Sequence, residues 1–229
     1  MNQIDRRMLN NRSLMLLAMG SQIVATITLF FAFIASPTSA WSTDTIIDEW
    51  DTVKAPRPPE LRPVKVDAKV TALLILDIQY GNCNPERRPR CVATLPGIQT
   101  LLTAARNKEM PVLFSLTRNA SKADIRKEVA PLPAEPIVKS GVDKFFSTDL
   151  ETILKAKGIE TVILVGTSAH GAVLHTAVGA AQRGLKVIVP VDGISAGDLY
   201  AEQYTCWHLV NSPGTRRQTT LTRISLIKF

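Results

Sequence analysis

The stretch Val-Thr-Ala-Leu-Leu-Ile-Leu-Asp-Ile, residues 70–78, decides the fold class of this chain. Its first seven residues carry no charge, and such a continuous run is typical of a strand that is buried on both faces of a parallel sheet. The strand is predicted to end at Asp77. In open sheets of this kind, ligands bind at the carboxyl ends of the strands, so Asp77 is a candidate functional residue.

Apolar strands and helical patterns alternate after this run. Strands are expected at 111–116, 161–165, 186–191 and 220–227, and helices at 97–108, from a Ser147 cap to Gly158, at 170–183 and at 200–210. Strands separated by helices of this length are joined by parallel crossovers. The prediction is an α/β fold, with a doubly wound, mostly parallel sheet and helices on both faces.

Basic, apolar and small residues follow one another at the N-terminus. Three arginines precede an apolar run at 23–35, and Ser-Pro-Thr-Ser-Ala ends at Ala40. This layout predicts that residues 1–40 are a signal peptide and that the protein is exported, either to the periplasm or out of the cell. An uncleaved membrane anchor is the alternative, because the apolar stretch counted from Leu14 is nearly long enough to span a bilayer.

The length of the remaining chain is that of a single domain. Residues 41–66 are polar and then proline-rich, which predicts a linker or an extended arm before a compact domain at 67–229. Residues 1–40 hold three arginines and one aspartate, so their removal lowers the net charge from +7 to +5. This mild excess favours anionic ligands. Nucleic-acid binding is not predicted, because no clustered basic face or binding motif is present.

Two of the three cysteines bracket a short polar loop. Cys83 and Cys91 enclose Asn-Pro-Glu-Arg-Arg-Pro-Arg, which has no apolar residue to hold its shape. A disulfide between them would close the loop in an oxidising compartment and stabilise the protein by about 2–3 kcal/mol. Sequence alone does not fix the connectivity. In this pairing Cys206 is left as a buried free thiol.

Two titratable residues are expected at one edge of the sheet. Asp77 ends the first strand, and Lys139 lies in the loop Pro-Ile-Val-Lys-Ser-Gly that leads to the third strand and its helix. A carboxylate and an ammonium group that lie together at this edge of the sheet can transfer or hold a proton. A purely structural ion pair is the alternative interpretation.

The turn after the third strand reads Val-Gly-Thr-Ser-Ala-His-Gly-Ala-Val, residues 165–173. The amides at a helix N-terminus can form an anion or oxyanion site without any side chain. No Gly-x-Gly-x-x-Gly or Walker loop is present, so no cofactor is predicted. The three histidines, His170, His175 and His208, lack metal-ligand spacing beside an acidic residue, so no metal site is predicted.

Together, three of these stretches resemble the isochorismatase-like hydrolases of the cysteine hydrolase superfamily. The resemblance rests on Leu-Leu-Ile-Leu-Asp-Ile-Gln at 73–79, on Lys139 six residues before Phe-Phe-Ser-Thr-Asp-Leu at 145–150, and on Val-Gly at 165–166. It covers residues 70–229. It implies a three-layer α/β sandwich and hydrolysis of a small molecule.

The family's triad is an Asp, a Lys and a Cys six residues after the glycine. The matching positions are Asp77, Lys139 and Ala172, so the nucleophile is replaced. Alanine cannot attack a carbonyl, which argues against covalent acyl transfer. True isochorismatases carry glycine there and cleave a vinyl ether by proton transfer from the Asp; this chain shares Ala169-His170 with their turn but has Ser168 in place of Tyr. Acid–base chemistry by Asp77, assisted by Lys139, is therefore implied.

The resemblance also implies an oxyanion or substrate pocket around this turn. Relatives often have a cis peptide here, between Thr167 and Ser168, which would let the amides of Ser168 and Ala172 line the pocket. Ala169, His170 and Gln79 are assigned to the same pocket. His170 either lines the pocket or caps the helix.

Arg87, Arg88 and Arg90 lie in the loop beyond Asp77. Guanidinium groups suit the carboxylate of an anionic substrate, and a solvated loop is the alternative interpretation. The alternative for the whole protein is a catalytically inactive member that binds a small molecule or serves as a scaffold, because fold does not establish function. A homo-oligomer is compatible with either function.

Overall fold

The structure is a computed structural model that describes residues 44–229. The predicted signal peptide, residues 1–40, lies outside the described residues. The described residues belong to two units, 44–53 in the first and 54–229 in the second. The described part of the first unit holds α1 (Ile46–Glu49), which Thr45 and Asp48 cap reciprocally, and a 3-10 turn (Trp50–Thr52). No helix within residues 44–229 is long and apolar enough to cross a membrane.

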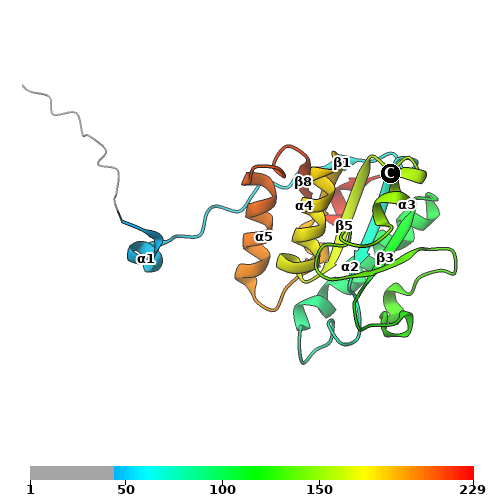
Figure 1. Cartoon of the computed structure of the whole chain (residues 1–229), viewed down its shortest axis with the longest axis horizontal. Coiled ribbons are helices and arrows are strands. Elements are labelled where there is room, and N and C mark those ends of the chain that lie inside the picture. The colour runs from blue at the N-terminus through cyan, green and yellow to red at the C-terminus, as the bar shows by residue number, and fades with distance from the viewer. Residues whose placement is uncertain (1–43) are drawn as a thin grey trace, which may run out of the picture. The chain divides into compact units, whose positions relative to one another are not determined.

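A parallel sheet forms the centre of the second unit (Figure 1). Its strands are β2 (Thr71–Leu76), β3 (Val112–Thr117), β4 (Ile137–Ser140), β5 (Thr161–Thr167), β6 (Lys186–Pro190), β7 (Ile194–Ser195) and β8 (Thr219–Thr222). The spatial order is β4-β3-β2-β5-β6-β8, with β7 also paired to β5, and every pair is parallel. The predicted doubly wound α/β fold is confirmed.

Helices cover both faces of this sheet. Successive residues of β2 point to opposite faces, because Ala72, Leu74 and Leu76 belong to one apolar core and Leu73 and Ile75 to the other. One core is completed by α2 (Pro89–Asn107), and the other by α3 (Leu150–Ala156), α4 (Leu174–Gln182) and α5 (Leu199–Asn211). Figure 1 shows α4 and α5 side by side on their face of the sheet.

Several element boundaries differ from the sequence prediction. The closing strand predicted at 220–227 is two strands, because a 3-10 turn (Ile224–Leu226) separates β8 from β9 (Ile227–Lys228). β9 pairs with β1 (Val64–Lys65), which lies within the predicted arm at 41–66. The predicted cap Ser147 has a left-handed backbone, and α3 starts later, after Asp149. In addition, α2 starts at Pro89 and continues through Pro96.

The strand order places a topological switch between β2 and β5. The chain leaves β2 towards β3 and β4 and then crosses back to β5 on the other side of β2. Leu76 pairs with Gly166 at this point. A Cβ on Gly166, whose φ is +130°, would lie 2.1 Å from the Leu76 carbonyl oxygen, so only glycine fits between the two strands. Ligands of doubly wound sheets bind at such a switch.

Candidate functional site

Asp77 lies immediately beyond β2, at the switch point. Its φ of 53° is in the left-handed region, and only 4% of its surface is exposed. One carboxylate oxygen, Oδ1, accepts a hydrogen bond from the Ser115 hydroxyl at 2.7 Å. The other, Oδ2, accepts from Lys144 Nζ at 2.8 Å. The carboxylate is therefore held by two neighbours that come from different parts of the chain.

Lys144 is fully buried. Besides Asp77, its Nζ donates to the carbonyl oxygens of Gly141 at 2.7 Å and Leu116 at 3.4 Å. These three acceptors match the three protons of an ammonium group. Because Lys144 has no exposed surface, it cannot contact a ligand directly. It binds Asp77 from the buried side of the carboxylate.

Lys139 does not lie beside Asp77, where the sequence predicts it. In β4, Val138 and Ser140 are buried, whereas Lys139 points the opposite way and is exposed. The pairing of Asp77 with Lys139 is thereby corrected to a pairing with Lys144. The signal that could have found it is the position of Lys144 directly before two phenylalanines, where a charged residue in an apolar context needs a buried partner.

The surroundings of Asp77 favour its neutral form. Burial raises the pKa of this carboxyl group, while the Lys144 ammonium group and the hydrogen bond from Ser115 oppose that rise. The net direction is upward. A carboxyl group in this condition keeps its proton to higher pH than an exposed aspartic acid and can act as a general acid.

A cavity of about 270 Å³ opens beside Asp77. Ser168 and Ala172, two residues of the predicted oxyanion pocket, line it together with Asp77. The Thr167–Ser168 peptide bond is cis. A π turn (Ala169–Val173) connects this bond to α4, and a Cβ on Gly171 would meet the Ser168 hydroxyl at 2.5 Å. The absence of a side chain at Gly171 thus leaves room for the Ser168 hydroxyl in the cavity wall.

The other residues assigned to this pocket lie elsewhere. Ala169 is fully buried in the core, and His170 is exposed in a separate groove between α4 and α5. This corrects both assignments, because the π turn directs Ala169 inward and His170 outward. Gln79 is buried and does not line the cavity, but its Oε1 accepts hydrogen bonds from two lining residues, from Thr117 Oγ1 at 3.1 Å and from Asn82 Nδ2 at 3.3 Å.

Three arginines line the same cavity. Arg87 and Arg88 come from the loop after β2, and Arg118, which the sequence analysis missed, follows β3. Arg90 is outside the cavity, where its Nε donates to Glu202 at 2.7 Å. None of the three cavity arginines has an acidic partner among residues 44–229. The cavity therefore carries an uncompensated positive charge.

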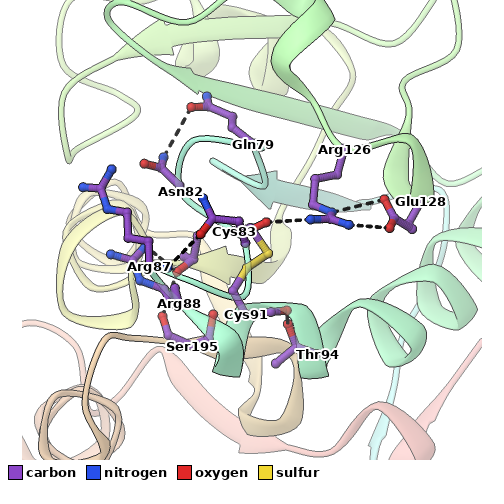
Figure 2. The surroundings of a disulfide bond; sticks show 12 residues. Gln79, Asn82, Cys83, Arg87, Arg88, Cys91, Thr94, Arg126, Glu128 and Ser195 are labelled. Carbon is purple, nitrogen blue, oxygen red and sulfur yellow. Dashed lines mark hydrogen bonds and ion pairs between the residues drawn. A yellow bond between two sulfur atoms is a disulfide. The ribbon is translucent and has the colours of Figure 1, made fainter.

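The predicted disulfide between Cys83 and Cys91 is present. Both cysteines are fully buried, and their Cα atoms are 5.2 Å apart. Figure 2 shows Arg126 on one side of this bond, where it donates to the Cys83 carbonyl oxygen at 2.8 Å and pairs with Glu128. Arg87 and Arg88 leave the loop on the other side. The disulfide thus fixes the base of the loop that carries two cavity arginines.

Comparison with known proteins gives consistent matches. The family model of the isochorismatase domain matches residues 71–220. A secreted isochorismatase effector of Verticillium dahliae is 32% identical over 60% of this chain and 78% of its own. Maleamate amidohydrolase of Pseudomonas putida is 34% identical over 52% of this chain and 68% of its own.

Solved structures show the same fold. A cysteine hydrolase from Pseudomonas syringae superposes with a TM-score of 0.62 at 20% identity, over 73% of this chain and 94% of its own. An isochorismatase from Pseudomonas putida superposes with a TM-score of 0.64 at 17% identity, over the same shares of the two chains.

Proposed function

Because the chain belongs to the isochorismatase family, we propose that it is a hydrolase that cleaves a small molecule by proton transfer from Asp77, without a covalent cysteine intermediate. The observation that carries this proposal is the Asp77 carboxyl group, which lines a cavity at the switch point while Ser115 and Lys144 hold it from behind. Ala172, at the position of the family's nucleophile, lines the same cavity and offers no group that could attack a carbonyl.

The chemistry that suits this arrangement is the hydrolysis of a vinyl ether. Asp77 donates its proton to the terminal vinyl carbon, and water adds to the oxocarbenium ion that results. The hemiketal then breaks its C–O bond and releases an alcohol and a ketone, and the proton lost by water restores Asp77. Lys144 is a positioning residue in this scheme, since it reaches the substrate only through Asp77.

The substrate in this proposal is anionic. Arg87, Arg88 and Arg118 surround the cavity, and Lys144 pairs with Asp77 behind it. The name of one relative, maleamate amidohydrolase, denotes a substrate that carries a carboxylate. Export is also part of the proposal, because the disulfide and the secreted relative are compatible with an oxidising compartment.

A second candidate function is binding without turnover, and the observation that favours it is Ala172 in place of a nucleophile. A pocket retained for binding would keep its shape and its arginines but need no proton donor. Turnover measurements separate the two functions.

The test is to incubate the full-length protein with isochorismate as a vinyl ether, and with maleamate and nicotinamide as amides. We expect cleavage of the vinyl ether, and a loss of about 100- to 10,000-fold in Asp77→Asn with an unchanged circular dichroism spectrum. Equal activity of Asp77→Asn and the parent would reject the acid role. No turnover of any compound, with saturable thermal stabilisation by one of them, would favour the binding protein.

A further inference from the structure

Arg88 is the best placed of the three cavity arginines to contact a ligand. Its Nη1 donates to Thr167 Oγ1 at 2.9 Å, and Thr167 in turn donates to the Ser195 carbonyl oxygen at 3.0 Å. One edge of the guanidinium group is thereby fixed against β5. Nε is buried and has no acceptor, and no residue among 44–229 accepts a hydrogen bond from Nη2. The group is oriented, yet its remaining donors are unused.

The neighbouring charges make this arrangement unfavourable without an anion. Arg87 donates to the Gly81 carbonyl oxygen at 3.0 Å, and Arg118 has no hydrogen bond within the described residues. Burial, and then the repulsion from Arg87, lower the pKa of the Arg88 guanidinium group. Three like charges around one small cavity are stabilised when a carboxylate enters, because its two oxygens accept the paired donors of a guanidinium group.

The disulfide determines where Arg88 lies. The backbone of the loop is tied down by hydrogen bonds from Cys83 N to the Gln79 carbonyl oxygen at 2.7 Å and from Arg88 N to the Asn84 carbonyl oxygen at 2.9 Å. Arg88 is three residues before Cys91, where the Cys83–Cys91 bond anchors the loop to α2. Without this bond, the loop would lose the connection that keeps Arg88 against Thr167.

We infer that Arg88, with Arg87 and Arg118 at the rim, binds a carboxylate of the substrate, and that the Cys83–Cys91 bond positions Arg88 for this contact. The inference rests on the proposed function, since it names the substrate class of that same cavity: small molecules that carry a carboxylate beside the group on which Asp77 acts. Arg88 is thereby a specificity-determining residue, and the loop that positions it contributes to the affinity for the substrate.

The test measures binding of maleate, a planar dicarboxylate, and of maleamide, its uncharged diamide, to the full-length oxidised protein by calorimetry. We expect maleate to bind at least about tenfold more tightly than maleamide, and Arg88→Gln to weaken maleate binding by about 10- to 100-fold. Arg90→Gln is the matched control, because Arg90 is two residues after Arg88, in the first turn of α2, but pairs with Glu202 outside the cavity. It is expected to change maleate binding by less than about twofold.

The disulfide is tested with the Cys83→Ser/Cys91→Ser double variant, whose fold is checked by circular dichroism. We expect it to lose maleate affinity to about the same extent as Arg88→Gln. Unchanged affinity in this variant would overturn the role of the disulfide. Equal binding of maleate and maleamide would overturn the carboxylate site, and so would phosphate binding as tight as that of maleate.

The turnover of Asp77→Asn separates this inference from the proposed function. Loss of turnover in Asp77→Asn, with unchanged maleate binding in Arg88→Gln, overturns the carboxylate site and supports the proposed function. Loss of maleate binding in Arg88→Gln, with full turnover in Asp77→Asn, supports the carboxylate site and overturns the acid role of Asp77 in the proposed function.

Discussion

Asp77 and Lys144 are 67 residues apart in the sequence, and their side chains meet at 2.8 Å beneath the switch point of the sheet. Lys144 has no exposed surface, whereas Asp77 retains a small exposed area that lines the cavity. The two residues therefore play unequal parts. Asp77 faces the ligand, and Lys144 fixes the orientation and the charge of Asp77.

Lys144→Met is predicted to be destabilising and inactive. It leaves a buried carboxylate without its partner, which typically costs about 3–5 kcal/mol. Lys139→Met is the matched control, because Lys139 is exposed in β4 and its loss is expected to change the free energy of unfolding by less than about 0.5 kcal/mol. Urea unfolding and turnover of both variants check this prediction, and a loss of activity in Lys139→Met alone would contradict it.

The Asp77→Asn/Lys144→Met double variant controls for misfolding. Replacing both members of the pair removes the buried charge, so the double variant is expected to be more stable than Lys144→Met. Its activity is expected to stay absent, because the proton donor is gone. Recovery of stability in the double variant would show that the instability of Lys144→Met comes from the unpaired Asp77 carboxylate and not from a general effect on the fold.

Ser115→Ala is predicted to shift the pH dependence of the reaction. The hydrogen bond from Ser115 lowers the pKa of Asp77, so its removal raises that pKa further. A general acid is active below its pKa, and the alkaline limb of the pH–rate profile should therefore move to higher pH. An upward shift of the acidic limb in place of the alkaline limb, measured on any compound that is turned over, would argue that Asp77 acts as a base.

The stability of the protein should follow the same titration. Because burial raises the folded pKa of Asp77 above 3.8, the stabilising contribution of its neutral form is complete below that pH and is lost as the pH rises through the raised pKa. In Ser115→Ala, the ionised form of Asp77 also lacks the hydrogen bond from the Ser115 hydroxyl. The variant should therefore lose stability relative to the parent as the pH rises, by about 1.5–3 kcal/mol once Asp77 is ionised. Urea unfolding across that range measures the difference.

The order of strands and helices was predictable because each element carries its own periodic pattern. The run at 70–78 is long, apolar and uncharged, and the buried β2 follows from it directly. In contrast, β4 was predicted to be a loop, because only four residues form it and one of them, Lys139, is charged and exposed. Short strands at a sheet edge contain too few residues for their alternation to be recognised.

The site was predictable where a residue lies at a strand end or in the loop that follows the first strand, as Arg87 and Arg88 do. Asp77, Ser168 and Ala172 line the cavity because β2 and β5 end at the switch point. Lys144 stands out in the sequence only as a charged residue before two phenylalanines. Its partner could not be assigned, since the contact with Asp77 depends on how the chain after β4 turns back under the sheet. Arg118 was missed although it directly follows β3, because its place in the cavity depends on how β3 lies beside β2.

Ala172→Cys is predicted to gain amidase activity. The new thiol would lie in the cavity beside Asp77 and Ser168, where a carbonyl could be attacked. We expect ammonia release from maleamate, which the parent should not catalyse. Ala169→Cys is the control, because Ala169 is in the same turn but fully buried and away from the cavity. Labelling of the Ala172→Cys thiol by iodoacetamide without any gain of activity would show that the pocket lacks more than a nucleophile.

The Cys83→Ser/Cys91→Ser double variant is predicted to be less stable by about 2–3 kcal/mol, because the unfolded chain regains the freedom of a short loop. For a protein of this size, that corresponds to a fall of about 5–10 °C in Tm. Cys206→Ser is the control, since Cys206 forms no disulfide. Burial raises the pKa of the Cys206 thiol to about 11, which keeps it uncharged and slow to exchange with the Cys83–Cys91 bond. Calorimetry on the three proteins tests the difference.

Gly166→Ala is predicted to destabilise the protein by at least about 3 kcal/mol. The new Cβ would lie 2.1 Å from the Leu76 carbonyl oxygen, and the φ of +130° is unfavourable for any side chain. Because neither backbone can move without separating β2 from β5, the strain would open the switch point that positions Asp77. Gly81→Ala is the matched control, since nothing lies within 4 Å of its added Cβ. The urea midpoint of Gly166→Ala should lie well below that of Gly81→Ala. Similar midpoints would mean that β2 and β5 can move apart at Gly166 at little cost in free energy.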